Sequence, residues 1–253
     1  MGEELQCDET HDISLVAGRA EPLPLSPGTE DFALAHLKNR DLAAADIEAI
    51  AQNAGLMQSR KVRVALAAHP HTPRRISLRV IRELYTFELM RFALTPAAAA
   101  DLRRVADMLL LSRLRSITLG ERISLARRSS ELVAGGLLVD KETPVWQAAL
   151  ENPRLTEACI VKALQRSATM PGFVEAVSHH PKWSLCAEIR VALLRNAYTP
   201  FSRAVEFAQR LHPAQLRDIL HTSRLPEKTK QYLKKASKQG PAGGDQGRHS
   251  LAQ

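Results

Sequence analysis

The sequence predicts an all-α fold, an α-solenoid in which antiparallel helix pairs stack with irregular repeats. Between the two ends of the 253-residue chain, apolar residues recur at spacings of three and four, the period of a helix face. No segment alternates apolar and polar residues as a half-buried strand does. Proline punctuates the helical segments at short intervals, with similar flanking residues, which indicates an internal repeat.

The two ends differ from the region between them. Residues 1–29 mix acidic side chains with three prolines and show no sustained period, so we expect a disordered acidic head. Residues 238–253 are rich in glycine and polar residues that bury little, so we expect a disordered tail. The helical-repeat domain is therefore predicted to span residues 30–237.

Each X-Pro pair predicts the end of one helix and the start of the next. Proline has a fixed φ and no N–H, which suits a first helical turn, and it pushes the preceding residue out of the α region. The stretch over residues 100–140 is predicted to hold a longer and a shorter helix joined near Gly120, with Gly135-Gly136 as a further turn. The dividing pairs are His69-Pro70, Thr95-Pro96, Thr143-Pro144, Asn152-Pro153, Met170-Pro171, His180-Pro181, Thr199-Pro200, His212-Pro213 and Leu225-Pro226.

Four segments share one helix-plus-turn pattern. Residues 62–73 (VRVALAAHPHTP) and 189–200 (IRVALLRNAYTP) are identical at six positions. Residues 145–156 (VWQAALENPRLT) and 173–184 (FVEAVSHHPKWS) share an alanine, an Asn or His, and a proline. Small alanines allow helices to approach, apolar residues fill the seam, and Asn or His stabilises a turn. Such units bury a continuous core only when several are stacked.

This pattern resembles the HEAT-like α-solenoids, and more closely the leucine-rich repeat variant type, a family of mostly bacterial helical-repeat proteins. The resemblance covers roughly residues 60–235. It implies helix packing and binding rather than catalysis.

The charge is distributed unevenly, although the net charge is +8. Residues 1–60 carry 4 basic and 11 acidic side chains, whereas residues 61–181 carry 18 and 11 and residues 182–239 carry 12 and 4. A basic body attracts polyanions, or it forms a solvated helix surface. The candidate polyanion-binding residues are Arg75, Arg79 and Arg82, which share a helix face, and Lys228, Lys230, Lys234 and Lys235 in the last helix.

No known catalytic or cofactor motif occurs, so we expect no catalytic, cofactor-binding or metal-ligating residues and no cofactor. The histidine pairs 69/71 and 179/180 are interpreted as turn residues, since Asn occupies the equivalent places. A DNA glycosylase would need an acid near a stacking aromatic, as Asp140 and Trp146 could supply. We interpret Asp140 and Glu142 instead as caps of the next helix, and Trp146 and Trp183 as core.

The predicted function is that of a non-enzymatic scaffold that binds a protein partner. The alternative is a nucleic-acid-binding helical-repeat protein, including a HEAT-like DNA repair glycosylase; docking to a membrane surface through a basic amphipathic helix is a third hypothesis. Three separated cysteines, no leader pattern and no transmembrane segment predict a cytoplasmic location. The partner's identity and the oligomeric state stay open.

Overall fold

The computed structural model describes residues 30–166 and 169–238, and over these residues it contains helices and no strand. The all-α prediction is confirmed. The expected head, residues 1–29, and nearly all of the expected tail lie outside the described residues. The helices are α1 (Glu30–His36), α2 (Ala44–Gln52), α3 (Ala54–Gln58), α4 (Arg60–Ala68), α5 (Arg74–Glu83), α6 (Thr86–Ala93), α7 (Ala100–Arg113), α8 (Leu119–Arg128), α9 (Glu131–Leu137), α10 (Thr143–Leu150), α11 (Glu157–Leu164), α12 (Pro171–His179), the short 3₁₀ helix η1 (Trp183–Leu185), α13 (Ala187–Arg195), α14 (Phe201–Gln209), α15 (Pro213–Thr222) and α16 (Glu227–Lys238).

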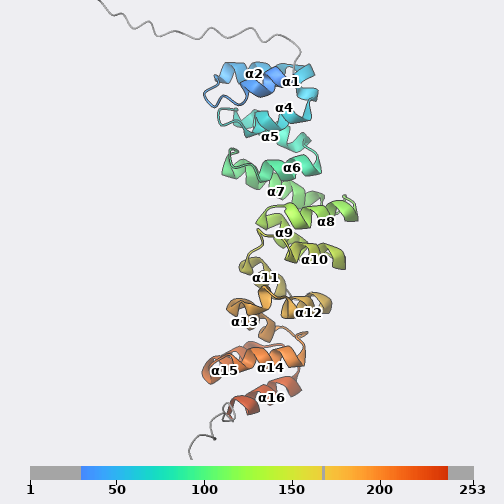
Figure 1. Cartoon of the computed structure of the whole chain (residues 1–253), viewed down its shortest axis with the longest axis vertical. Coiled ribbons are helices and arrows are strands. Elements are labelled where there is room, and N and C mark those ends of the chain that lie inside the picture. The colour runs from blue at the N-terminus through green and yellow to red at the C-terminus, as the bar shows by residue number, and fades with distance from the viewer. Residues whose placement is uncertain (1–29, 167–168, 239–253) are drawn as a thin grey trace, which may run out of the picture.

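The helices follow one another in chain order along the long axis of the molecule (Figure 1). The odd-numbered helices from α5 to α15 form one row, in which each contacts the next. The even-numbered helices form a second row, with contacts within the groups α4–α6, α8–α10–α12 and α14–α16. Because each helix packs only on near neighbours, the core runs along the whole stack instead of filling one centre.

The predicted X-Pro pairs fall where one helix ends and another follows, but the proline starts the next helix at only some of them. After Pro70, Pro96 and Pro153, turn residues come before α5, α7 and α11 begin. Pro144, Pro171 and Pro213 lie in the first turn of their helices, where a missing N–H has no cost, and Pro73 and Pro200 directly precede theirs.

The prediction for residues 100–140 is wrong, because this stretch forms three helices, α7, α8 and α9. Gly135 and Gly136 lie inside α9 and do not form a turn. A Cβ on Gly135 would lie 2.9 Å from Cys159 Sγ, and one on Gly136 would lie 2.5 Å from Leu111 Cδ2. The two glycines therefore permit α9 to pack closely on α11 and α7.

The four aligned segments share a burial pattern. Their first positions, Val62, Val145, Phe173 and Ile189, and their fifth positions, Leu66, Ala149, Val177 and Leu193, are all buried. Residues four apart lie on one face of a helix, so each segment turns the same face into the core. The segments belong to α4, α10 and α12 in the even row and to α13 in the odd row. The shared pattern therefore describes a helix and its end, not a helix pair.

Polar side chains in the turns tie successive helices together. Four turn residues each make hydrogen bonds of two kinds. Each side chain donates to a main-chain carbonyl earlier in the chain, and it also accepts a hydrogen bond from the main-chain N–H two residues further on; in Ser223 the same hydroxyl does both. The donor bonds are His69 Nε2 to Asn39 O (2.8 Å), Asn152 Nδ2 to Ala126 O (2.8 Å), Asn196 Nδ2 to Leu164 O (2.8 Å) and Ser223 Oγ to Leu194 O (2.6 Å). The acceptor bonds are made at the same four residues. The structural interpretation of the turn Asn and His residues agrees with these bonds.

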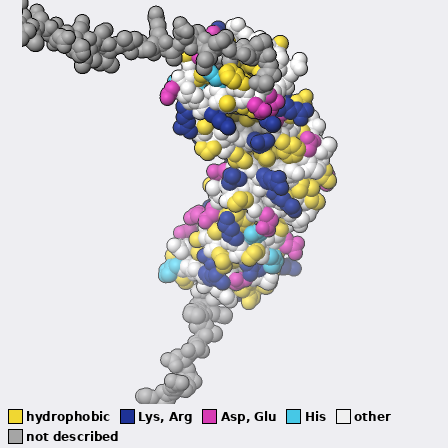
Figure 2. Space-filling view, turned by 45° about the horizontal axis from the view of Figure 1, so that its top comes forward, with side chains coloured by type: hydrophobic (Ala, Val, Ile, Leu, Met, Phe, Trp, Pro, Cys, Tyr) yellow, Lys and Arg dark blue, Asp and Glu magenta, His cyan; other side chains and the backbone are white. Residues whose placement is uncertain are grey.

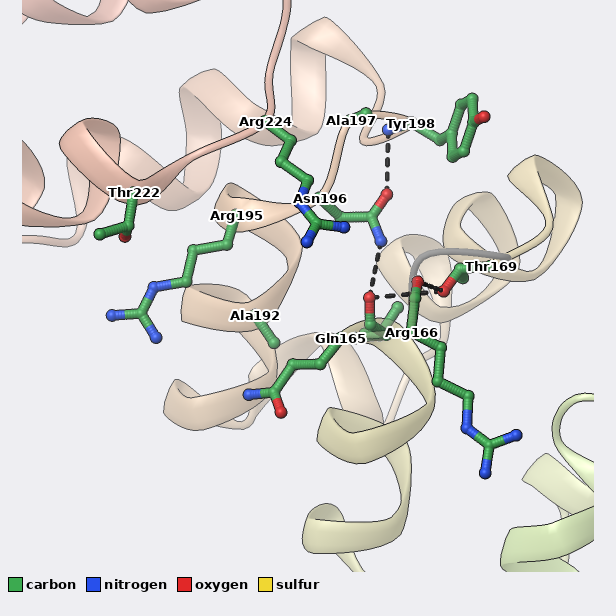
Figure 3. A pocket seen from close by; sticks show the side chains of 11 residues that line it. Gln165, Arg166, Thr169, Ala192, Arg195, Asn196, Ala197, Tyr198, Thr222 and Arg224 are labelled. Carbon is green, nitrogen blue, oxygen red and sulfur yellow. Dashed lines mark hydrogen bonds between the residues drawn. The ribbon is translucent and has the colours of Figure 1, made fainter.

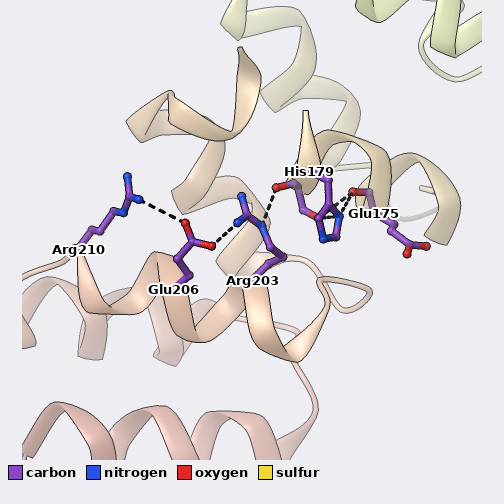
Figure 4. A network of polar contacts seen from close by, with 6 residues as sticks. Glu175, His179, Arg203, Glu206 and Arg210 are labelled. Carbon is purple, nitrogen blue, oxygen red and sulfur yellow. Dashed lines mark hydrogen bonds and ion pairs between the residues drawn. The ribbon is translucent and has the colours of Figure 1, made fainter. Parts of the chain in front are cut away.

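Several arginines also hold helices together. Arg113 donates to the carbonyls of Leu84 and Arg82 (both 2.7 Å), which caps the end of α5. Arg203 of α14 donates to the carbonyl of Ser178 (2.8 Å) in α12 and pairs with Glu206, as Figure 4 shows. Part of the basic character of the chain is therefore structural.

A buried carboxylate links α7 to α9 and predicts a pH effect. Asp107 accepts a hydrogen bond from Ser130 Oγ (2.6 Å). Burial raises the pKa of Asp107, although the Ser130 bond and the charge of Arg103 lower it. The folded state therefore binds the proton more tightly than the unfolded state, so this group's contribution to stability is present in acid and is lost as the pH rises through the raised pKa.

We expect Asp107→Asn, which keeps an acceptor for Ser130, to gain stability relative to the wild type as the pH rises from about 4 to 7. The measurement is the difference in urea-unfolding free energy between the two proteins across this range. A difference that stays constant or falls with pH contradicts the assignment.

Candidate functional site

Three arginines surround a pocket at the ends of consecutive odd-row helices. Arg166 follows α11, Arg195 ends α13 and Arg224 follows α15. The pocket has a volume of about 360 Å³. Figure 3 shows the three guanidinium groups at separate positions around it. Its remaining lining residues are Leu164, Gln165, Thr169, Ala192, Asn196, Ala197, Tyr198 and Thr222.

Hydrogen bonds hold several described parts of the backbone around this arginine pocket. Asn196 binds Leu164 O and the Tyr198 N–H, which joins the end of α11 to the turn after α13. The Arg224 N–H donates to Arg195 O (3.0 Å), which brings the third arginine's backbone against the second. Thr169 donates to Arg166 O (2.6 Å). These bonds hold main-chain groups at Leu164, Arg166 and Arg195, at or next to the arginines.

The arginine side chains themselves are exposed and unpaired. Within residues 30–166 and 169–238, no carboxylate or carbonyl binds the guanidinium groups of Arg166, Arg195 or Arg224, and no acidic residue lines the pocket. Other arginines are paired, such as Arg74 with Asp101 and Arg122 with Asp140. A guanidinium group keeps its positive charge in proteins and offers five hydrogen-bond donors but no acceptor. The three guanidinium groups therefore supply charged hydrogen-bond donors suited to binding an anion.

Exposed aromatic side chains lie beside the arginine pocket along the chain. Tyr198, in the pocket lining, is 51% exposed, and Phe201, at the start of α14, is 50% exposed. The Phe201 ring packs edge-on against Tyr232 of α16, with 5.1 Å between centroids. Arginine and aromatic residues are the types enriched at the centres of protein interfaces.

The predicted polyanion-binding residues form two separate groups. Arg75, Arg79 and Arg82 are exposed on α5, and Arg75 pairs with Glu48 (2.7 Å) across a second pocket of about 350 Å³ against α2. Lys228, Lys234 and Lys235 are exposed on α16, whereas Lys230 is half-buried and pairs with Glu227 (3.6 Å).

The structure does not bring these two groups together, because α5 and α16 lie far apart along the stack (Figure 1). On the face that Figure 2 shows, basic side chains occur in separate clusters with apolar and acidic side chains between them.

The other singled-out residues have structural roles. Trp146 and Trp183 are buried, and Trp183 Nε1 donates to Leu150 O (3.0 Å), so neither ring is free to stack on a base. Glu142 occupies the N-cap position of α10, but its side chain makes no capping bond. Asp140 accepts from the Glu142 N–H (3.0 Å) and also binds Arg122 (2.8 Å), so the capping prediction holds only for Asp140 and only at the N-cap residue.

His69 and His71 each bond a main-chain carbonyl of the loop between α1 and α2. Over the described residues, no three His, Cys, Asp or Glu side chains gather as metal ligands would.

Three groups in the described residues have a pKa that departs from its ordinary value, and all three lie outside the arginine pocket. Besides Asp107, hydrogen bonds from the main chain and side chain of Thr118 lower the pKa of Glu121. Burial raises the pKa of the Cys186 thiol, and the nearby Glu157 adds to this effect.

Sequence reasoning missed Arg166, Arg195 and Arg224, although one signal marks them. Arg195 follows Arg166 by 29 residues, and Arg224 follows Arg195 by 29 residues. This spacing is close to the distance along the chain between the starts of α11, α13 and α15. A search for basic residues at a fixed period would have grouped them.

No protein-family model, curated protein or solved structure matches this chain. Across residues 30–166 and 169–238, none of the helices is both long and apolar enough for a bilayer crossing.

Proposed function

We propose that the chain is a non-enzymatic, cytoplasmic helical-repeat protein of the α-solenoid type that binds a protein partner through the arginine pocket. The observation that carries this proposal is the set of three unpaired guanidinium groups on a backbone that hydrogen bonds hold at several points. Binding sites of this kind avoid the entropic cost of ordering flexible loops. The neighbouring Tyr198 and Phe201 add apolar contact area.

A differential capture experiment tests this function. The full-length chain is immobilised and exposed to an extract of the cells that produce it, next to the variant Arg166→Ala/Arg195→Ala/Arg224→Ala. A matched control, Arg104→Ala/Arg115→Ala/Arg127→Ala, removes the same charge from exposed positions on and after α7 and on α8. We expect one protein to be retained by the wild type and the control and lost from the pocket variant. Equal recovery by all three contradicts the proposal.

Nucleic acid is the second candidate, favoured by the exposed basic residues of α5 and α16. Its test is binding of labelled mixed-sequence DNA and RNA at two salt concentrations. A nucleic-acid site predicts tight binding that weakens steeply with salt and that falls when Arg79, Arg82, Lys234 and Lys235 are replaced. Absence of binding at low salt removes this candidate.

A further inference from the structure

We propose that the arginine pocket receives the carboxylates of an acidic peptide segment in the protein partner. This inference rests on the proposed function and specifies the chemistry of the partner. The ligand it names is a short run with at least two Asp or Glu side chains and an apolar neighbour.

The first support is that, among the described residues, no acceptor binds the guanidinium donors of the three arginines. Elsewhere in the stack, arginines such as Arg113 cap the last carbonyls of a neighbouring helix. Around the arginine pocket, uncharged side chains already bind those carbonyls: Thr199 binds Leu193 O (2.6 Å) and Ser223 binds Leu194 O (2.6 Å). The arginines are therefore left with donors directed to solvent, and the forked donor geometry of arginine matches a carboxylate.

The second support is a comparison within the same chain. The pocket between α2 and α5 has nearly the same volume and is also lined by arginine. There the chain supplies its own acid, and Glu48 binds Arg75 at 2.7 Å. The arginine pocket has three arginines and no acid among its lining residues. An incoming carboxylate would complete the arrangement that Glu48 completes in the pocket between α2 and α5.

The third support favours a peptide over a nucleic-acid backbone. The pocket, with about 360 Å³, suits a few side chains. A nucleic-acid strand is held by a basic groove that follows it over several phosphates, whereas the groups on α5 and α16 are separated by most of the stack. Tyr198 at the pocket edge offers an apolar surface to a residue next to the acids.

The test is fluorescence anisotropy with the full-length chain and a labelled peptide that combines glutamate pairs with leucine. The comparison probes are the same peptide with glutamine in place of glutamate, a serine-phosphorylated glutamine version, and a short single-stranded DNA. We expect the glutamate peptide to bind most tightly and to weaken with salt. Each of Arg166→Ala, Arg195→Ala and Arg224→Ala should weaken binding about tenfold. The control triple variant at Arg104, Arg115 and Arg127 should stay within about twofold of the wild type, because screening weakens long-range effects of charge.

Several outcomes overturn the inference. Equal binding of the glutamine peptide, or an unchanged affinity of the pocket triple variant, shows that carboxylates are not recognised there. Preference for the phosphorylated peptide or for DNA assigns the pocket to phosphate. If the glutamate peptide fails while capture from the extract still depends on the three arginines, the acidic-segment inference falls and the proposed function stands. If both fail, both fall. Since Arg166, Arg195 and Arg224 are exposed, their variants should keep the wild-type unfolding midpoint.

Discussion

Replacing Leu193 by alanine is expected to lower the free energy of unfolding by about 2–5 kcal/mol. Leu193 lies in α13, the helix that contacts α11, α12, α14 and α15, and its side chain is fully buried. Truncation removes buried methyl groups and leaves a cavity that the surrounding helices fill only in part. Chemical denaturation followed by circular dichroism measures the loss.

Leu185→Ala is the matched control, because Leu185 is 63% exposed in the adjacent η1. Its effect should stay within about 0.5 kcal/mol, as for most surface changes. Similar losses for the two variants would contradict the position of Leu193 in the core and, with it, the alignment of the four segments. Leu66→Ala, the equivalent substitution in α4, should behave as Leu193→Ala does.

The Asn152→Ala variant is expected to lose about 2–4 kcal/mol, even though it removes few atoms. Asn152 is buried, donates to the carbonyls of Ala126 (2.8 Å) and Ser129 (3.2 Å), and accepts from the Arg154 N–H (2.8 Å). Alanine leaves these main-chain groups without their partner, and an unpaired buried group costs about 1–3 kcal/mol.

Asn152→Asp separates the donor and acceptor roles of this side chain. Aspartate keeps the acceptor for Arg154 but removes both donor bonds and places negative charge against two carbonyl oxygens. Its loss at neutral pH should match or exceed that of Asn152→Ala, and it should shrink in acid, where a protonated carboxyl can donate one bond. Urea denaturation at pH 4 and pH 7 checks this. A loss below about 0.5 kcal/mol for Asn152→Ala would show that the turn bonds contribute little to the stack.

Much of the fold could be predicted because local chemistry decides it. Proline at Pro144, Pro171 and Pro213 has one compatible place in a helix, its first turn, so the boundaries followed from the sequence. The alternation of buried and exposed positions in the four aligned segments follows from the helical period. Gly135 and Gly136 misled the prediction, because glycine serves turns and close helix packing alike, and only the positions of Cys159 and Leu111 distinguish the two uses.

The candidate site was harder to predict because it is assembled from three segments that are distant in sequence. Which arginines are free depends on their neighbours: Arg75 meets Glu48, and Arg113 meets two carbonyls, but Arg195 meets neither. Composition shows that the body is basic but not which charges the fold neutralises. The sequence correctly placed Arg75, Arg79 and Arg82 on one helix, but it could not show that Glu48 of α2 pairs with Arg75.

The most direct test of the central claim is site-specific photo-crosslinking in cell extract. A benzoylphenylalanine is placed at Tyr198 in one full-length chain and at Tyr85, a similarly exposed tyrosine that directly precedes α6, in another; Tyr198 is 51% exposed and Tyr85 is 59% exposed. The account predicts that a single protein is crosslinked from position 198, that the Arg195→Ala/Arg224→Ala background abolishes this product, and that position 85 does not yield it. The same product from both positions, or one that persists without the two arginines, would contradict binding at the arginine pocket.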